Sequence, residues 1–329
     1  MSGHGNTWAL VLAAGEGSRL HSLTRTQSGS PVPKQFCSLW QGPSLFHDAL
    51  IRARAVALNE YICAVMARQH HGWWQGLTGL MPSANIIVQP HNRGTANGIL
   101  LPLLHILARD PNAQIVILPS DHHVREEAVL AHALWRAVEQ LRWRIDETVL
   151  LGLEPVESDS ELGYIVPGDS DGRGALEVEQ FVEKPTLAQA HEIIEHGGLW
   201  NAFILASSGQ ALLSLFRRRM PEIVSEMRAA VHQDLADPDE APATAELYGT
   251  LPNIDFSRDI LQGQERRLRV LPVAQCGWSD LGTPERIGQV LDHGPRSERR
   301  NAWRSHPGHL SLAVEFERRR IAAGLCAQY

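Results

Sequence analysis

The stretch that decides the fold is Trp8-Ala-Leu-Val-Leu12, which runs directly into Ala13-Ala-Gly-Glu-Gly-Ser-Arg-Leu20 and is followed by Pro33-Lys-Gln-Phe36. The five apolar residues predict a short buried strand. The two glycines of the second stretch allow a tight turn that brings backbone N–H groups against an anion. The arginine of the second stretch and the lysine of the third add two cations. The sequence therefore predicts a loop that binds the phosphates of a nucleotide.

Two other glycine-rich loops do not match this stretch. A dinucleotide-binding fingerprint, Gly-x-Gly-x-x-Gly, needs a third glycine where Leu20 stands. A Walker loop needs Gly-Lys-Ser/Thr, which the sequence does not contain. A simple turn between a strand and a helix would explain Gly15 and Gly17, but it would not require Arg19 and Lys34.

The segments 15–20 and 33–36 together resemble the signature of the sugar-1-phosphate nucleotidylyltransferases, the NDP-sugar pyrophosphorylases. The Pro-Lys-Gln-Phe form is most similar to the mannose-1-phosphate guanylyltransferases. The intervening segment is a few residues longer than is usual in this family and lacks the usual proline after Leu20. Because residues 21–33 carry little apolar surface, we expect them to be mobile without substrate.

Composition limits the class of protein further. The 329 residues are 43% hydrophobic, which is enough for a large α/β domain with a sizeable core. No apolar run approaches the roughly 20 residues of a membrane span, and the first residues do not form a signal peptide, so we expect a cytoplasmic protein. A net charge of −7 argues against a nucleic-acid binder. The four cysteines are widely spaced and indicate neither a zinc site nor a disulfide framework.

Strand and helix patterns alternate through the first half, which predicts a doubly wound, mostly parallel, Rossmann-like α/β sheet. Strands are expected at 8–12, 61–66, 86–88, 115–118 and 148–153, and helices at 45–57, 95–108 and 128–145. The second half, with strands expected at 163–166, 176–182 and 201–206, predicts a smaller, mixed sugar-binding sheet. No hexapeptide repeat is present, so we expect no left-handed β-helix.

These patterns suggest a division of the chain. We expect a nucleotidyltransferase domain at 1–291, with a nucleotide-binding half at 1–153 and a sugar-phosphate half at 154–291. A polar, helical C-terminal tail is expected at 292–329, with a helix near 310–323.

Two carboxylates are candidate metal ligands. Asp121 follows the expected strand at 115–118, and Asp280 lies in Gly277-Trp-Ser-Asp-Leu-Gly-Thr283. Both elements resemble motifs of the family, and the resemblance implies that the two aspartates hold Mg²⁺, a cation that prefers carboxylate oxygen. Either aspartate alone could instead cap a turn. His122 and His123 could bind a transition metal, but adjacent histidines point apart.

The sugar phosphate is expected to bind in the second half. Phe181-Val-Glu-Lys-Pro185 resembles a family signature in which Lys184 holds the phosphate and Glu183 accepts hydrogen bonds from sugar hydroxyls. A surface Glu–Lys pair is the plain alternative. The resemblance also implies sugar contacts from the Gly163 backbone and the Asn201 side chain. Asp255, in Asn253-Ile-Asp-Phe256, is a further candidate for this site.

The base is expected to bind at Gln89-Pro-His-Asn-Arg-Gly-Thr-Ala96, which resembles the base-reading turn of the family. Thr95 could instead serve only as a helix N-cap. The following Asn97-Gly98 departs from the usual Pro-Ala, which leaves the base less determined than the reaction. The resemblance implies that the nucleotide is bound by Leu12, Ala13, Gly15, Gly17, Ser18, Gln89, Gly94 and Thr95, and that the catalytic residues are Arg19, Lys34, Asp121 and Lys184.

The resemblance implies a reaction of GTP with mannose 1-phosphate to give GDP-mannose and pyrophosphate, with Mg²⁺ as cofactor. Its partners are then GTP or another NTP and a sugar 1-phosphate, with no nucleic acid or membrane, and a homo-oligomer stays open. One alternative is another base or sugar, such as UTP or dTTP with glucose 1-phosphate. The other is a catalytically silent regulatory subunit, which should lack some of Arg19, Lys34, Asp121 and Asp280. All four are present.

Overall fold

A computed structural model describes residues 6–26, 29–40, 42–170, 172–237 and 242–293. The helix expected near 310–323, and the tail expected at 292–329 beyond His293, lie outside these ranges. Within them, no helix is long and apolar enough to cross a membrane.

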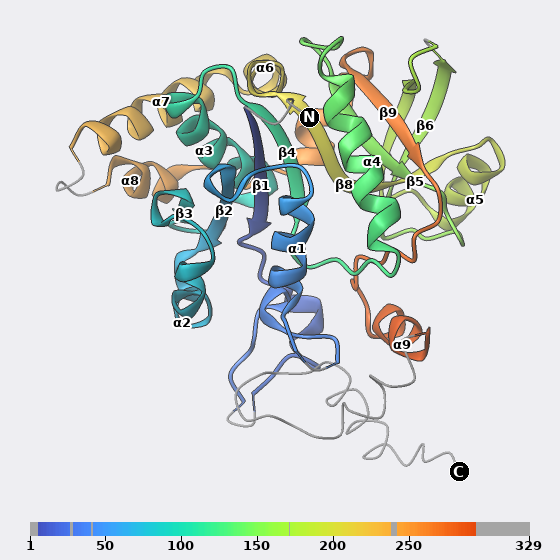
Figure 1. The fold of residues 1–329 in the computed structure, drawn as a ribbon, viewed down its shortest axis with the longest axis horizontal. Coiled ribbons are helices and arrows are strands. Elements are labelled where there is room, and N and C mark those ends of the chain that lie inside the picture. The colour runs from blue at the N-terminus through green and yellow to red at the C-terminus, as the bar shows by residue number, and fades with distance from the viewer. Residues whose placement is uncertain (1–5, 27–28, 41, 171, 238–241, 294–329) are drawn as a thin grey trace.

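The strands of the described residues form one sheet with the order β3-β2-β1-β4-β8-β5-β9-β7-β6. The bounds are β1 Thr7–Ala13, β2 Ile62–Ala67, β3 Ile86–Gln89, β4 Gln114–Pro119, β5 Thr148–Leu153, β6 Gly163–Ser170, β7 Leu176–Glu183, β8 Leu199–Ser208 and β9 Leu268–Val273. The strands β1 to β4 are parallel, with β1 between β2 and β4 (Figure 1). Every strand expected from the sequence is confirmed, and β9 is an additional one.

The prediction of a second, smaller sheet is wrong, because β8 joins the strands of the second half to those of the first in one sheet. This 10-residue strand pairs antiparallel with both β4 and β5. At its start it also pairs with β6, through Tyr164↔Trp200 and Ile165↔Leu199. That last pairing closes β6, β7, β9, β5 and β8 into a barrel-like ring at one end of the sheet. The mixed strand directions expected for the second half are present, but within a continuous sheet.

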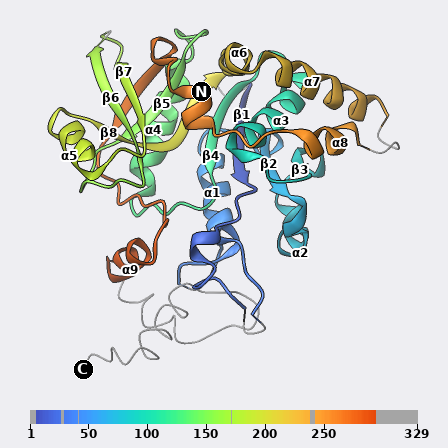
Figure 2. The same ribbon diagram turned by 180° about the vertical axis from the view of Figure 1, so that it is seen from behind.

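Helices cover both faces of the sheet (Figures 1 and 2). Their bounds are α1 Leu45–Arg54, α2 His71–Trp74, α3 Gly94–Arg109, α4 Glu127–Gln140, α5 Leu187–Glu195, α6 Gly209–Arg219, α7 Pro221–Ala236, α8 Ala243–Thr250 and α9 Pro284–His293. Alternate residues of β1 enter different cores, as strand geometry requires. Ala9 and Val11 pack with α1 and α4, whereas Trp8 and Leu10 pack with α3, α6 and α7.

Two helices end earlier than the sequence predicts, and the first of them, α1, ends at Arg54 instead of residue 57. Helix α4 ends at Gln140 instead of continuing to residue 145. Its apolar periodicity runs on through Ile145, but that side chain is 68% exposed and marks no buried face. An apolar residue at helical spacing is therefore not sufficient to extend a helix beyond its core.

The described part of segment 21–33 is anchored, contrary to the expectation that little apolar surface holds it. Leu23 and Val32 are buried in the core beneath α1. The backbone N–H of Val32 donates to the carbonyl of Thr24 at 2.6 Å. The two ends of the segment therefore form a short stem that fixes where Lys34 enters the site.

Candidate active site

The predicted phosphate loop lies after β1, at the carboxyl end of the parallel strands, where ligands bind in open α/β sheets. The amide of the buried Gln35 donates to the carbonyls of Ala13 at 2.9 Å and Gly15 at 3.0 Å. Gly17 has φ 61° and precedes the short helix Ser18–Leu20. A β-carbon on Gly17 would lie 3.1 Å from the Cβ of Lys34. The loop and the Pro-Lys-Gln-Phe element therefore pack against each other.

Lys34 is a buried cation paired with Asp121. Its side chain is 7% exposed, and its Nζ lies 2.8 Å from Oδ2 of Asp121. The same Nζ donates to the backbone carbonyl of Asp280 at 2.6 Å. Partial burial would raise the pKa of Asp121, but the charges of Lys34 and His122 and the hydrogen bond from Lys34 outweigh it and lower that pKa. The carboxylate is therefore ionised at neutral pH.

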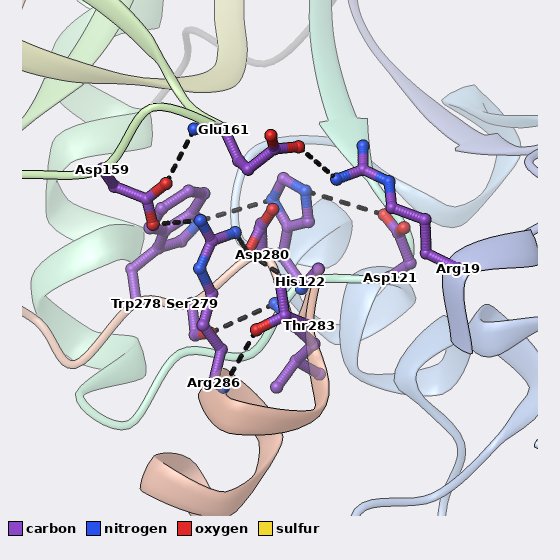
Figure 3. Close-up of polar contacts among 12 residues, drawn as sticks. Arg19, Asp121, His122, Asp159, Glu161, Trp278, Ser279, Asp280, Thr283 and Arg286 are labelled. Atoms are coloured by element: carbon purple, nitrogen blue, oxygen red, sulfur yellow. Dashed lines mark hydrogen bonds and ion pairs between the residues drawn. The ribbon is translucent and has the colours of Figure 1, made fainter. Parts of the chain in front are cut away.

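Backbone hydrogen bonds bring the Asp121 and Asp280 segments side by side (Figure 3). The N–H of His123 donates to the carbonyl of Ser279 at 2.8 Å, and the N–H of Ser279 donates back to the carbonyl of His123 at 2.9 Å. On the other side, the buried Arg52 donates to the carbonyl of His122 at 3.0 Å. The fold thus joins two segments that lie far apart in the sequence.

Asp280 is held by partners on its own turn. Its Oδ1 accepts hydrogen bonds from the backbone N–H of Gly282 at 2.9 Å and from Nη1 of Arg286 at 2.6 Å. Burial would raise the pKa of Asp280, but the nearby charges of His122, Arg286 and Lys34 lower it. Leu281, the next residue, has a left-handed backbone with φ 50°, a conformation that is costly for a branched side chain and is concentrated at functional sites.

Sequence reasoning missed Arg286 and its second partner, Asp159. The guanidinium of Arg286 forms ion pairs with both Asp280 and Asp159 (Figure 3). Asp159 belongs to the connection between β5 and β6. Arg286 lies three residues after Thr283, whose hydroxyl caps α9 by accepting from the N–H of Arg286 at 3.4 Å. Only the position of Arg286 in a first helical turn was visible in the sequence, and that position does not reveal either partner.

His122 is neutral at neutral pH and becomes charged only at the low pH at which Asp121 and Asp280 titrate. Burial lowers its pKa to about 4. The indole N–H of Trp278 donates to Nδ1 of His122 at 3.3 Å, so the proton of the neutral ring lies on Nε2, which is 3.7 Å from Oδ1 of Asp121. The described residues contain no group of three or more His, Cys, Asp or Glu that could hold a metal ion.

The two aspartates fit a hard divalent cation. Both are held in the ionised form, and carboxylate oxygen is the ligand type that Mg²⁺ prefers. Mg²⁺ usually takes one or two protein carboxylates and fills its other positions with water and substrate phosphate oxygens. Two carboxylates beside a phosphate loop therefore fit an ion shared with a polyphosphate, not one held by protein alone.

Arg19 extends from the phosphate loop to the connection before β6 (Figure 3). Its Nη1 lies 2.8 Å from Oε2 of Glu161, and the two side chains are 56% and 50% exposed. An ion pair this exposed to water is weak. Arg19 can therefore exchange Glu161 for a phosphate at little cost.

A cavity of about 440 Å³ lies beside the phosphate loop. Five predicted nucleotide-binding residues line it, namely Leu12, Gly15, Gln89, Gly94 and Thr95, whereas Ala13, Gly17 and Ser18 do not. Gly98, one of the departures from the family pattern, also lines it, and a β-carbon there would lie 3.0 Å from Oε1 of Gln89. The cavity contains one cation that the sequence reasoning missed, the exposed Arg258.

The role of Thr95 as a helix cap is not borne out. Helix α3 begins at Gly94 with Arg93 at its N-cap position. The hydroxyl of Thr95 instead accepts a hydrogen bond from the N–H of Phe256 at 2.8 Å and lies 3.5 Å from Oδ2 of Asp255. A β-carbon on Gly94, which has φ 83°, would lie 2.2 Å from the carbonyl of Ile254. The predicted base-reading turn is therefore packed tightly against the Asp255 element.

Most of the predicted sugar-contacting residues gather where β6 pairs with β7 and β8, whereas Asp255 lines the cavity that also holds Gln89 and Thr95. Gly163 pairs in register with Glu183, and a β-carbon on Gly163 would lie 2.6 Å from Oε2 of Glu183 and 3.4 Å from Cβ of Asn201. Burial and the charge of Asp255 raise the pKa of Glu183, although Lys184 and Arg258 oppose them. Lys184 is exposed and has φ 51°. Only a residue without a side chain at 163 leaves room for this cluster.

A second cavity, of about 580 Å³, shares Asp280 and Arg286 as part of its wall. It is lined by Trp40, Trp200 and Trp278 and by residues of α9. It contains none of the predicted nucleotide-binding or sugar-binding residues. The predicted nucleotide-binding residues therefore gather at the smaller cavity, whereas Asp280 lies at the larger one.

The fold, the phosphate loop and the paired carboxylates define a nucleotide-dependent group-transfer protein of the α/β class. A family model described as "Nucleotidyl transferase" matches residues 8–293, and the chain belongs to this family.

The chain is similar to three proteins whose names refer to alginate biosynthesis or to mannose 1-phosphate. The chain is 27% identical over 288 residues to the alginate biosynthesis protein AlgA of Pseudomonas syringae pv. tomato, which covers 85% of this chain and 57% of AlgA. It is 27% identical over 278 residues to the mannose-1-phosphate guanylyltransferase RfbM of Salmonella typhimurium, covering 83% of this chain and 56% of RfbM. A solved structure titled mannose-1-phosphate geranyltransferase, from Thermus thermophilus, superposes with a TM-score of 0.75 at 28% identity, covering 88% of this chain and 80% of that one.

The chain therefore spans just over half the length of the curated relatives it matches. The alignments cover the fold and the site described above. The remaining length of those relatives has no counterpart in the matched region.

Proposed function

We propose that the protein transfers a nucleotidyl group from an NTP to a sugar 1-phosphate with release of pyrophosphate, most specifically from GTP to mannose 1-phosphate. The observation that carries the proposal is the contact of Lys34 with both the Asp121 carboxylate and the Asp280 backbone, beside a phosphate loop and a nucleotide-sized cavity. The similarity to RfbM, which is named a mannose-1-phosphate guanylyltransferase, supports the choice of base and sugar.

The residues fall into two halves with different tasks. Residues 1–153 bind the nucleotide, with the base near Gln89 and Thr95. Residues 154–291 bind the sugar phosphate, with Lys184 on the phosphate and Glu183, Asn201 and the Gly163 backbone on the hexose. In support, the smaller cavity is lined mainly by residues of the first half, joined by Asn253, Asp255 and Arg258 of the second, and the Gly163 cluster lies wholly in the second half.

The reaction is an in-line displacement at the α-phosphorus. A phosphate oxygen of the sugar 1-phosphate forms a bond to that phosphorus, and the bond to the oxygen that bridges the α- and β-phosphates breaks. Pyrophosphate leaves with the bonding electron pair. Arg19 and Lys34 neutralise the charge of the transferring and leaving groups. No side chain forms a covalent intermediate, so the reaction needs no activated nucleophile.

Asp121 and Asp280 would hold the divalent cation, which we propose to be Mg²⁺. When bound, it would neutralise the triphosphate oxygens and orient them for displacement. The protein's contribution is to keep both carboxylates ionised and fixed beside the loop. The cytoplasm, which supplies GTP and sugar phosphates, is the proposed location.

A substrate panel tests the proposal. Four nucleotides, GTP, UTP, dTTP and ATP, are each combined with mannose 1-phosphate and with glucose 1-phosphate, and pyrophosphate release is measured. We expect the highest kcat/KM for GTP with mannose 1-phosphate. A higher value for another pair would reassign the base or the sugar. No release from any pair, with nucleotide binding intact, would favour a regulatory subunit.

A further inference from the structure

Arg286 is a largely buried arginine that forms ion pairs with two carboxylates of the site. Its side chain is 12% exposed, and its guanidinium spans two carboxylates that are themselves largely buried, Asp159 at 15% and Asp280 at 21% exposed. The contact with Asp280 measures 2.6 Å. Figure 3 shows Arg286 between these two carboxylates. Because both its partners are protein groups, Arg286 acts on the site through them.

The turn between Asp280 and Arg286 is built for this pair. The segment turns through Leu281, whose φ is 50°, and then enters α9. A β-carbon on Gly282 would lie 2.5 Å from Oδ2 of Asp280 and 2.9 Å from Nη1 of Arg286. Any side chain at this position would therefore push the two partners apart.

The ion pair of Arg286 with Asp280 makes the site less negative towards an incoming cation. Asp121 has Lys34 at 2.8 Å, and Asp280 has Arg286 at 2.6 Å. With Asp159 included, the cluster holds three carboxylates and two cations and retains a single net negative charge. Divalent cations bind tightly to protein alone where several carboxylates are uncompensated. This cluster is already compensated before any ligand arrives.

We infer that Arg286 is a positioning residue that neutralises Asp280 in the substrate-free protein, so that the divalent cation enters together with the nucleotide. The inference rests on the proposed function in one respect, that Asp280 holds the cation. A triphosphate supplies the anionic oxygens that the compensated cluster lacks. Arg286 thus makes metal binding depend on nucleotide binding, while it holds Asp280 in place.

The test is direct binding of Mn²⁺ to the protein without nucleotide, measured by electron paramagnetic resonance of free Mn²⁺. Wild-type protein should bind Mn²⁺ weakly. Arg286→Met removes the charge and keeps much of the side-chain volume, so it should tighten Mn²⁺ binding by roughly tenfold or more, because a positive charge beside the ligand is gone. Arg286→Lys keeps the charge and should stay close to wild type.

Gln289→Ala is the matched control, since Gln289 lies one turn along the same helix, is exposed and lines the same larger cavity. It should leave Mn²⁺ binding unchanged. If Arg286→Met does not fold, Gly282→Ala gives the same test, because its β-carbon separates Asp280 from Arg286. Tighter Mn²⁺ binding in that variant supports the inference.

Tight Mn²⁺ binding by the wild-type protein without nucleotide would overturn the inference, as would unchanged binding in the folded Arg286→Met or Gly282→Ala variant. Failure of the proposed function is visible separately. It would appear as absent pyrophosphate release in the substrate panel, whatever the pattern of Mn²⁺ binding.

Discussion

The nucleotide-binding half and the sugar-phosphate half prepare for their ligands in opposite ways. In the first half, together with the Asp280 turn of the second half that packs against it, the charged groups are paired before a ligand arrives, Lys34 with Asp121 and Arg286 with Asp280. In the second half, Lys184 is exposed and makes no ion pair with any described residue, and the pKa of Glu183 is raised. A ligand that binds at the first set of charges must therefore break existing ion pairs. A ligand that binds at Lys184 would instead supply the ion-pair partner that this side chain lacks among the described residues.

The largest effect is expected from removing the charge of Asp280, which is paired before a ligand arrives. Asp280→Asn keeps an oxygen that can accept from Gly282 and Arg286 but removes the charge. We expect turnover to fall about a hundredfold or more, the scale seen when one preorganised electrostatic contact is lost. Steady-state kinetics across a Mg²⁺ titration measures it, with the exposed Glu285→Gln as control. Near-normal turnover of Asp280→Asn at low Mg²⁺ would remove Asp280 from the metal site.

At the sugar-phosphate site, Lys184→Ala should selectively weaken the binding of the sugar 1-phosphate. A lost hydrogen bond to a charged group predicts a loss of affinity of roughly tenfold or more, with GTP affinity unchanged. Isothermal titration with each substrate measures both affinities, and Glu179→Gln, an exposed residue of the strand that precedes Lys184, serves as control. Weakened GTP binding with unchanged sugar-phosphate binding would mean that the two halves are assigned in reverse.

The raised pKa of Glu183 predicts a stability effect with a defined sign. A carboxyl whose pKa is raised on folding contributes stability at low pH and loses that contribution as pH rises through the raised pKa. Glu183→Gln should therefore raise the Tm at pH 7, and the difference from wild type should disappear as pH falls below the ordinary glutamate value of 4.5. Thermal unfolding across this pH range checks it. A Tm difference that grows towards low pH would contradict the burial of Glu183.

The smallest effect is expected at the exposed pair of Arg19 and Glu161. Glu161→Gln should leave the free energy of unfolding almost unchanged, because exposed ion pairs contribute about 0 to 1 kcal/mol. It should lower the KM for GTP a few-fold at low salt, because Arg19 then has no ion pair with Glu161 to break before it binds the nucleotide. The difference in KM from wild type should become smaller as salt screens the ion pair. A KM for GTP that rises in Glu161→Gln would show that the pair helps to bind the nucleotide.

Local patterns in the sequence predicted the first half better than the second. The phosphate loop, Asp121 and the strands around them are each encoded in a short run of neighbouring residues. Strand β9 was missed because Pro272 stands inside it, and proline argues against a central strand. The structure accommodates Pro272 because β7 pairs with β9 only at Arg269 and Val270, which leaves that side of the proline unpaired.

The features that the sequence did not reveal depend on contacts between distant segments. The two halves are joined because β8 pairs with both β4 and β6, and the sequence of β8 alone does not show which strands it pairs with. The pairing of Arg286 with Asp159 likewise links residues 127 positions apart. Resemblance to a family supplied the expected roles of Glu183 and Asn201, and the pairing of β6 with both β7 and β8 explains why they lie together.

The central claim is that this site joins a nucleotide to a sugar 1-phosphate. Phosphorus-31 NMR of GTP and mannose 1-phosphate, incubated with the protein and Mg²⁺, tests it most directly, because it identifies every phosphorus-containing product. The account predicts that the signals of both substrates decline together while those of GDP-mannose and pyrophosphate appear in equal amounts. Release of inorganic phosphate with GDP, or unchanged GTP in the presence of mannose 1-phosphate, would contradict it.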